Sequence, residues 1–185
     1  KFDLFVVDSS SSDDTQSVLR DRLGYVHVIP SADFNHGGTR QLMVDLHPGY
    51  EVYVFMTQDA CLFDVDSIAK IVEPFCDPSV GAVCGRQLAH LNATPLAQHA
   101  RAFNYPFGVV VKTMDDVPRL GIKTAFMSNS FAAYRAIALQ AVGGFPVHMI
   151  FAEDMFVAAR MLLSGWKVVY AGNAQCRHSH NYSML

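Results

Sequence analysis

Near the start of the chain lies Phe2-Asp3-Leu4-Phe5-Val6-Val7-Asp8, a largely apolar run that ends in an aspartate. A second run of the same kind, Val52-Tyr53-Val54-Phe55-Met56, is followed three residues later by Asp59. Short runs of β-branched and aromatic residues favour strands. A polar turn at residues 9–14 and a stretch with helical spacing at residues 15–23 follow the first run. Strand, turn and helix in this order predict an α/β fold with a mostly parallel sheet flanked by helices.

The same alternation continues to the end of the chain. We expect strands over residues 2–7, 25–29, 51–56, 80–85, 126–134 and 166–171, and helices over residues 15–23, 39–46, 64–75, 95–105, 135–142 and 152–164. Residues 108–124 show no clear period and are expected to form a mobile loop. No repeat or linker interrupts the 185 residues, so we expect a single catalytic domain over residues 1–185. The start without Met, inside a strand pattern, suggests a fragment whose first strand and helix are missing.

Composition excludes several classes of protein. A chain with 51% hydrophobic and 17% charged residues is globular rather than disordered. Fourteen Lys and Arg against seventeen Asp and Glu give a net charge of −3, which argues against a nucleic-acid binder. No apolar run reaches the ~18 residues of a membrane span. The four cysteines form no CxxC pair, which favours buried, reduced thiols in a cytoplasmic protein.

Asp8 and Asp59 both follow a predicted strand. In open α/β sheets the carboxyl ends of the strands border the ligand crevice. A carboxylate there could bind a ribose hydroxyl, a base N–H or a divalent cation, although either residue could simply be a turn aspartate. The serines between Asp8 and Thr15, including Ser10, could present hydroxyl and N–H groups to a nucleotide or form a solvated turn. Two aspartates at one sheet edge favour a functional site.

Charged residues near two helix starts are further candidates. We place Arg40 in the first turn of its helix, where a cation opposes the helix dipole. Pairing with a carboxylate or a diphosphate would explain it, and Gly37 and Gly38 would let a ligand approach the backbone. Glu153 and Asp154 either favour a helix N-terminus or supply a general base.

His178 and His180 follow the last strand at a spacing of two. They share one face of an extended segment and could both reach a metal, or be ordinary surface histidines. The other six histidines are scattered along the chain.

Taken together and in order, these segments resemble the family 2 glycosyltransferases of GT-A fold. Residues 34–40, 57–60 and 178–183 are most similar to the bacterial rhamnosyltransferase branch, which uses dTDP-L-rhamnose to build cell-surface polysaccharides. The resemblance covers nearly the whole chain and rests on Val6-Val7-Asp8-Ser9, Ser12-Asp13-Asp14-Thr15, Gly38-Thr39-Arg40, Thr57-Gln58-Asp59, Ser128-Asn129-Ser130, Tyr134-Arg135, Val142-Gly143-Gly144-Phe145, Glu153-Asp154 and Ala174 with His178.

The resemblance implies a role for each matching residue. Asp154, with Glu153 beside it, would be the general base of an inverting transfer that needs no carboxylate nucleophile. Asp59 would bind Mg²⁺ or Mn²⁺, with His178 as a further metal or diphosphate contact. The residues implied in donor binding are Asp8 and Ser10 for the nucleotide, Arg40, Gln58 and Asp59 for the diphosphate side, and Asn129 for the sugar side.

The implied partners are a nucleotide-diphosphate sugar and a saccharide or lipid-linked acceptor, with a peripheral position at the inner face of the membrane. Thr57-Gln58-Asp59 lacks the first acid of the family's DxD motif. One alternative is therefore a non-catalytic module that binds nucleotide sugars. A family 2 transferase for a UDP- or GDP-linked sugar is another. A phosphohydrolase of the haloacid dehalogenase type is a third, although Asp8-Ser9-Ser10 lacks its second acid.

Overall fold

The computed structural model of the protein describes residues 2–179. The chain forms two compact units. The first unit consists of Lys1–Gly49 with Phe145–Glu153, and the second of Tyr50–Gly144 with Asp154–Leu185. That the two units make up one catalytic domain stays a prediction.

The first unit contains a two-stranded sheet and two main helices. Strands β1 (Val7–Asp8) and β2 (His27–Val28) pair in parallel, with Val7 opposite His27. Helix α1 (Thr15–Leu23) has the bounds expected from the sequence and ends at Gly24, whose φ of 76° suits a glycine. The buried strand expected over residues 2–7 is wrong, because β2 offers only two residues to pair with. Phe2 and Leu4 are accordingly exposed.

Helix α2 (His36–Leu46) follows a short 3₁₀ turn, η1 (Ser31–Asp33). It begins three residues earlier than expected because the Asn35 side chain caps it, accepting a hydrogen bond from the Gly38 N–H at 2.6 Å. Arg40 therefore lies in the second turn of α2, and its placement in the first turn was wrong.

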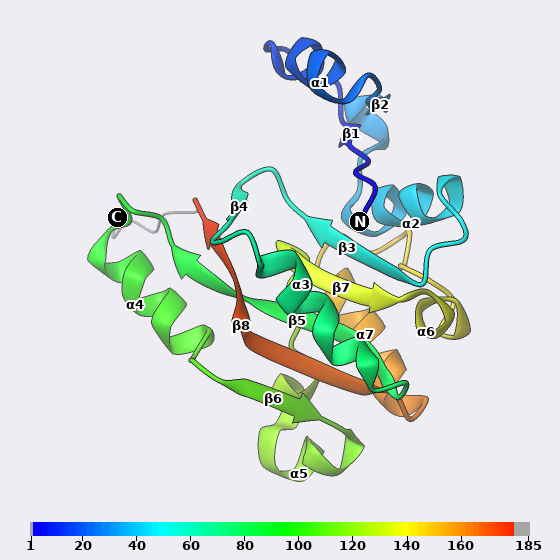
Figure 1. Ribbon diagram of the computed structural model, residues 1–185. Coiled ribbons are helices and arrows are strands. Elements are labelled where there is room, and N and C mark those ends of the chain that lie inside the picture. Colours follow the sequence, from blue (N-terminus) through cyan, green and yellow to red (C-terminus); the bar gives the residue numbers. More distant parts are fainter. Residues whose placement is uncertain (1, 180–185) are drawn as a thin grey trace. The chain divides into compact units, whose positions relative to one another are not determined.

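The second unit is built on a six-stranded mixed sheet (Figure 1). In this sheet, among residues 50–179, β5 and β8 pair in parallel and the other four pairings are antiparallel. The expectation of a mostly parallel sheet is therefore wrong for this unit, because hydrophobic runs reveal strands but not their directions. The strands are β3 (Val52–Met56), β4 (Ala60–Leu62), β5 (Val80–Ala89), β6 (Val109–Lys112), β7 (Phe131–Arg135) and β8 (Lys167–His178), in the order β3-β7-β5-β8-β4 with β6 also on β8.

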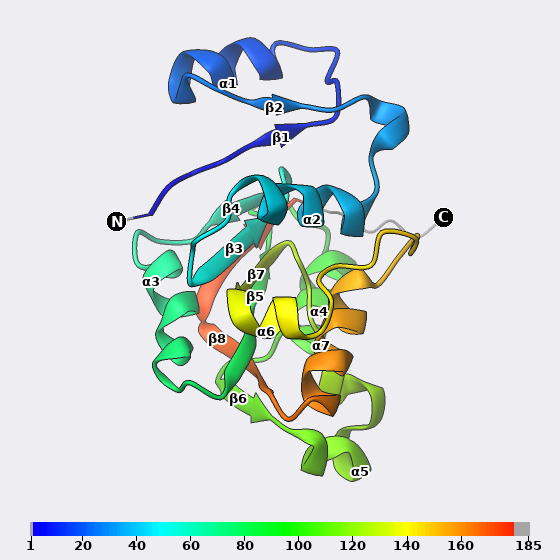
Figure 2. The ribbon, with the colours of Figure 1, turned by 90° about the vertical axis from the view of Figure 1, so that its right-hand side faces the viewer.

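Helices cover both faces of this sheet. Figure 2 shows α3 on one side and α6 and α7 on the other. The core contains Val83, Phe131 and Ala133, all fully buried. The helices are α3 (Ser67–Val72), α4 (Pro95–Asn104), α5 (Val117–Leu120), α6 (Ala136–Ala141) and α7 (Glu153–Leu163), with 3₁₀ segments η2 (Glu73–Cys76), η3 (Met114–Asp116) and η4 (Gly121–Ala125).

Three expectations are corrected in the second unit. Residues 108–124 are not a loop, because β6 pairs with β8 and η3, α5 and part of η4 follow it. Strands β5 and β8 pair as far as Ala89 opposite His178, so both run well beyond their expected ends at residues 85 and 171. All four cysteines are free, but Cys61 and Cys76 are exposed rather than buried.

Within residues 2–179, the helices are too short or too polar for any of them to cross a membrane.

Candidate functional site

Asp8 is a buried carboxylate at the end of β1. Its Oδ2 accepts hydrogen bonds from the Ser11 N–H at 2.9 Å and the Gln16 amide at 2.9 Å, and its Oδ1 accepts one from the Ser11 hydroxyl. The Ser11 hydroxyl is the main reason that the pKa of Asp8 lies below its usual value. The serine turn therefore holds Asp8 as an anion, with Ser11 and Gln16 as partners that sequence analysis did not single out.

Ser10, the serine expected at the nucleotide, faces another way. Its hydroxyl donates to the Ile29 carbonyl oxygen at 2.8 Å, and its φ of 62° is unusual for a residue other than glycine. Its side chain thus fastens the turn to the end of β2. A contact between Ser10 and a nucleotide stays a prediction.

Arg40 forms an ion pair with Glu153 in the first unit. The Nη1–Oε1 distance is 2.8 Å, and only 13% of the Arg40 side chain and 7% of the Glu153 side chain are exposed. Burial makes such a pair costly to break, because removal of one partner leaves an unpaired charge. Of the two partners considered for Arg40, a carboxylate or a diphosphate, the structure shows a carboxylate, that of Glu153. Its contact with Asp59 or a diphosphate stays a prediction.

Asp59 lies in the turn between β3 and β4, in the second unit. Its Oδ1 accepts a hydrogen bond from the Thr57 hydroxyl at 2.5 Å, and its Oδ2 lies 3.2 Å from Nε2 of His178. The last residue of β8, His178, faces Ala60 across the β4–β8 pairing, which brings its ring to this turn. The structure thus brings together the two residues expected at a metal. Gln58, beside them, is exposed. His180 lies outside the described residues.

The carboxylate of Asp59 could serve as the one protein ligand of a divalent cation. About a third of its side chain is exposed, and each carboxylate oxygen keeps a second acceptor position besides its present partner. Within residues 2–179, no group of three or more His, Cys, Asp or Glu side chains could hold a metal. Mg²⁺ is typically held by one or two carboxylates, with waters and substrate phosphates completing its ligands, so Asp59 fits such an ion.

Asp154 lies at the start of α7 in the second unit. Its Oδ1 accepts from the Met155 N–H at 2.7 Å and its Oδ2 from the Asn129 N–H at 3.1 Å. The Asn129 side chain is buried and accepts from the Tyr134 hydroxyl at 2.8 Å. Asn129 thus holds Asp154 through its backbone, while contact of its side chain with a sugar stays a prediction. Asp154 itself is half-buried and keeps access to solvent.

A buried polar cluster behind His178 was missed by sequence analysis. Arg101 of α4 and Gln87 of β5 are 9% and 2% exposed, and they connect His178 to Ser128. A glutamine in the continuation of an apolar strand was the one available signal. The contacts within this cluster could not be found from sequence, because each of them joins residues that lie 14 to 77 positions apart in the chain.

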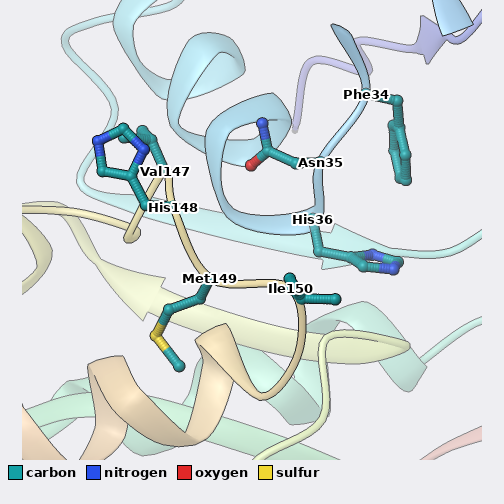
Figure 3. Close-up of a pocket in the computed structure, with 7 residues that line it drawn as sticks. All are labelled: Phe34, Asn35, His36, Val147, His148, Met149 and Ile150. Carbon is teal, nitrogen blue, oxygen red and sulfur yellow. The ribbon is translucent and has the colours of Figure 1, made fainter. Parts of the chain in front are cut away.

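A hollow of about 390 Å³ opens in the first unit beside the start of α2 (Figure 3). Residues 34–36 form one wall and residues 147–150 the other. The second wall leads into Ala152, whose φ of 65° is strained for an alanine, and then into Glu153. The hollow thus lies between the residues that precede Arg40 in the chain and the residues that precede Glu153.

The sequence profile of glycosyl transferase family group 2 matches residues 54–184. The chain belongs to this family. The matched segment contains Asp59, Asn129, Asp154 and His178, so the residues expected at the metal and the base lie inside it. The family assignment made from sequence is confirmed.

Two curated family 2 relatives are similar along nearly the whole chain. The O-antigen chain rhamnosyltransferase RfbN of Salmonella typhimurium is 52% identical over 181 residues, which are 97% of this chain and 58% of RfbN. The O-antigen chain rhamnosyltransferase WbaN of Salmonella anatum is 49% identical over 180 residues, with coverage of 97% and 57%. The chain therefore spans somewhat more than half of the length of these relatives.

Solved structures of glycosyltransferases share the fold. The mannosyltransferase PcManGT of Pyrobaculum calidifontis, in complex with GDP-Man and Mn²⁺, matches with a TM-score of 0.64 and 21% identity, over 95% of this chain and 47% of that one. S. aureus TarS 1-349 matches with a TM-score of 0.70 and 17% identity, over 96% and 51%. The family 2 chain thus has the GT-A fold, as the resemblance implied, with a mixed sheet.

Proposed function

We propose that the full-length protein is an inverting glycosyltransferase that moves L-rhamnose from dTDP-rhamnose to a hydroxyl of a growing cell-surface polysaccharide. The observation that carries the proposal is the identity of about half of all residues with two O-antigen chain rhamnosyltransferases, over 97% of this chain. Family membership supports the reaction class, and the relatives support the sugar and the polysaccharide.

Asp154 is the general base in this proposal. The Asn129 and Met155 N–H groups hold its carboxylate in a defined orientation, and the side chain is half-buried rather than sealed off. Glu153 suits the role less, because it is 6% exposed and paired with Arg40. Asp154 takes the proton of the acceptor hydroxyl, whose oxygen displaces the diphosphate in one step that inverts the anomeric carbon. Glu153 then supports the base through its pair with Arg40.

Asp59 holds the Mg²⁺ or Mn²⁺ in this proposal. A divalent ion bound there would neutralise charge on the departing diphosphate. Two observations support metal use: the chemistry of Asp59 and the Mn²⁺ in the structure of the mannosyltransferase with the same fold. The remaining donor contacts are assigned to Asp8 with its serine turn, Arg40, Gln58 and Asn129.

A saccharide or a lipid-linked saccharide is the proposed acceptor. A lipid-linked acceptor would bring the protein to the cytoplasmic face of the membrane as a peripheral protein. The O-antigen relatives support a polysaccharide acceptor.

A binding titration and a transfer assay on the full-length protein test this function. We expect Mn²⁺-dependent binding of dTDP-rhamnose that is tighter than the binding of UDP-GlcNAc or GDP-mannose. Labelled rhamnose should then be incorporated into the glycolipid of membranes from a strain that lacks the gene for this protein. Tighter binding of a UDP- or GDP-sugar would show that the donor is that sugar nucleotide and not dTDP-rhamnose. Binding of dTDP-rhamnose without transfer to any such membrane would favour a non-catalytic module.

Three variants assign the roles within that assay. Asp154→Asn should abolish transfer and leave nucleotide affinity nearly unchanged, whereas Asp59→Ala should remove the Mn²⁺-dependent part of nucleotide binding. The exposed Asp115 provides the matched control, Asp115→Asn, which should behave as wild type. Normal transfer by Asp154→Asn would disprove its role as base, and an unchanged Mn²⁺ titration of Asp59→Ala would disprove the metal assignment.

A further inference from the structure

Arg101 carries a buried positive charge in the second unit. Within residues 2–179, it makes no ion pair with a carboxylate, and its Nε has no hydrogen-bond partner. Its Nη1 donates to Gln87 Oε1, its Nη2 lies 3.0 Å from Nδ1 of His178, and its guanidinium lies 5.8 Å from the centre of the Tyr105 ring. Burial of a cation without a directly paired anion is costly, so this arrangement calls for a reason.

The contact with Arg101 determines which nitrogen of His178 carries the proton. A guanidinium has only donors, so a hydrogen bond at 3.0 Å requires Nδ1 of His178 to be the acceptor. A neutral imidazole whose Nδ1 accepts carries its hydrogen on Nε2. That Nε2 faces Asp59 Oδ2 at 3.2 Å, so His178 donates a hydrogen bond to the carboxylate.

The same contact opposes metal ligation by His178. A ligand nitrogen must offer its lone pair, so Nε2 bound to a metal would leave the ring hydrogen on Nδ1. That hydrogen would face the N–H of Arg101, and two donors would meet at 3.0 Å. His178 can therefore bind a metal through Nε2 only if its contact with Arg101 breaks.

Gln87 holds Arg101 in place. Since Arg101 can only donate, the amide oxygen of Gln87 must face it, and the amide nitrogen then donates to the Ser128 hydroxyl at 2.7 Å. Gln87 is 2% exposed, so little room is left for another orientation. Ser128 precedes Asn129, whose N–H binds Asp154. The buried chain from Asp59 through His178, Arg101 and Gln87 thus ends beside the support of Asp154.

We propose that Arg101 and Gln87 are positioning residues that fix His178 as an Nε2–H donor to Asp59, and that His178 orients this carboxylate without binding the metal. The second half of this inference rests on the proposed metal role of Asp59. Thr57 and His178 then hold one oxygen each, and a lone pair of each oxygen stays available to the ion.

The tautomer of His178 is tested first, with no metal or donor present. In full-length protein labelled with ¹⁵N-histidine, two-bond ¹⁵N–¹H correlation spectra distinguish protonated from bare ring nitrogens, and His178→Gln assigns the signals. We expect a bare Nδ1 and a protonated Nε2. A proton on Nδ1, alone or together with one on Nε2, would overturn the proposal.

Substitutions of Arg101 test whether this residue fixes the tautomer of His178. Arg101→Met should remove the bias toward the Nε2–H tautomer and weaken Mn²⁺-dependent dTDP binding by about 10–100-fold, the usual effect of losing a residue that orients a metal ligand. Arg101→Lys, which keeps the donor, should recover much of both. Arg119→Met at an exposed position and His99→Gln on α4 are the matched controls. An unchanged tautomer in a folded Arg101→Met protein would show that Arg101 does not fix it.

Pulsed electron paramagnetic resonance of bound Mn²⁺ tests the ligand assignment. We expect no coupling of directly bound ¹⁴N in the complex with dTDP. A ¹⁴N coupling that disappears in His178→Gln would make His178 a ligand and refute the proposal. If Mn²⁺ does not bind at all, the proposed metal use fails, whereas the tautomer experiment still decides whether Arg101 positions His178.

Discussion

At Gly37 the backbone of α2 lies against the carbonyl of Pro146 in the first unit. A Cβ built on Gly37 would lie 1.9 Å from the Pro146 oxygen, a contact that requires the backbone to move. The sequence suggested that the Gly37-Gly38 pair lets a ligand approach. In the structure, Gly37 instead lets another part of the chain approach, and so helps to place the segment that leads to Glu153.

Gly37→Ala should therefore lower the free energy of unfolding by about 1–3 kcal/mol, the usual cost of overpacking. Gly24→Ala is the control, because its Cβ meets nothing within 4 Å and its cost comes from the left-handed φ alone. Chemical denaturation of both variants provides the measurement. An undiminished stability of Gly37→Ala would show that Pro146 moves away freely.

Asp8 should contribute stability that depends on pH. Its pKa is lowered in the folded chain, mainly by the Ser11 hydroxyl, so its contribution is present above the unfolded pKa and is lost as the pH falls through the folded value. We expect Asp8→Asn to be less stable than wild type by about 1 kcal/mol at pH 7. The gap should narrow once the pH falls below about 4, the unfolded pKa, and should continue to narrow through the lower folded pKa, as followed by urea denaturation.

Asp21→Asn, at an exposed position of α1, is the control for Asp8 and should show little change. A gap between wild type and Asp8→Asn that is the same at pH 5 and pH 3 would contradict the anionic role of Asp8.

At the scale of elements, β6 carries an unusual lysine. Lys112 is 4% exposed, and its Nζ donates to the Phe126 carbonyl oxygen at 2.8 Å. Burial is the main reason that its pKa falls to about 8. This burial explains why residues 108–124 show no clear hydrophobic period. In β6 the valines are exposed and the lysine is buried, the reverse of the usual pattern.

The stability of wild type relative to Lys112→Met should rise with pH. Between about pH 8 and 10.5 the unfolded lysine holds a proton that the folded one has lost, so higher pH favours folding. The difference between the two proteins should change by about 3 kcal/mol over this range. Comparison with the variant removes the opposing effect of buried tyrosine and cysteine groups. Lys123→Met, at an exposed position, is the matched control for the loss of a lysine. A difference between wild type and Lys112→Met that stays constant over this range would refute the lowered pKa.

At the scale of the whole molecule, the two units contain sheets of different size: two strands in the first unit and six in the second. The central strands β5, β7 and β8 of the second unit contain many fully buried residues, whereas β1 and β2 are two residues long each. Local opening is easiest where few apolar contacts and few backbone hydrogen bonds must break.

Hydrogen exchange measured by mass spectrometry should therefore distinguish these sheets. We expect amides of β5 and β8 to exchange only through unfolding of the second unit, and amides of β1 and β2 to exchange much faster. Equal protection of the peptides that contain β1 and β5 would show that the two-stranded sheet is as stable as the large one.

The sequence alone determined the elements whose signals are local. Helix α1 has its expected bounds, α7 ends within one residue of them, and strands were expected where β3, β5 and β7 lie. The order of short motifs also identified the family, because each motif is contiguous in the chain. Of the expected site, the proximity of Asp59 and His178 and a carboxylate partner for Arg40 agree with the structure.

Only the tertiary structure decided the rest. The direction of the strands, the pairing of β6 with β8 and the partner of Arg40, 113 residues away, depend on contacts between distant segments. Periodicity records which side of an element is buried but not what packs against it. For the same reason Arg101 and Gln87 were missed. Their significance comes from the His178 ring between them and Asp59, and this neighbourhood exists only once β8 has paired with β4 and β5.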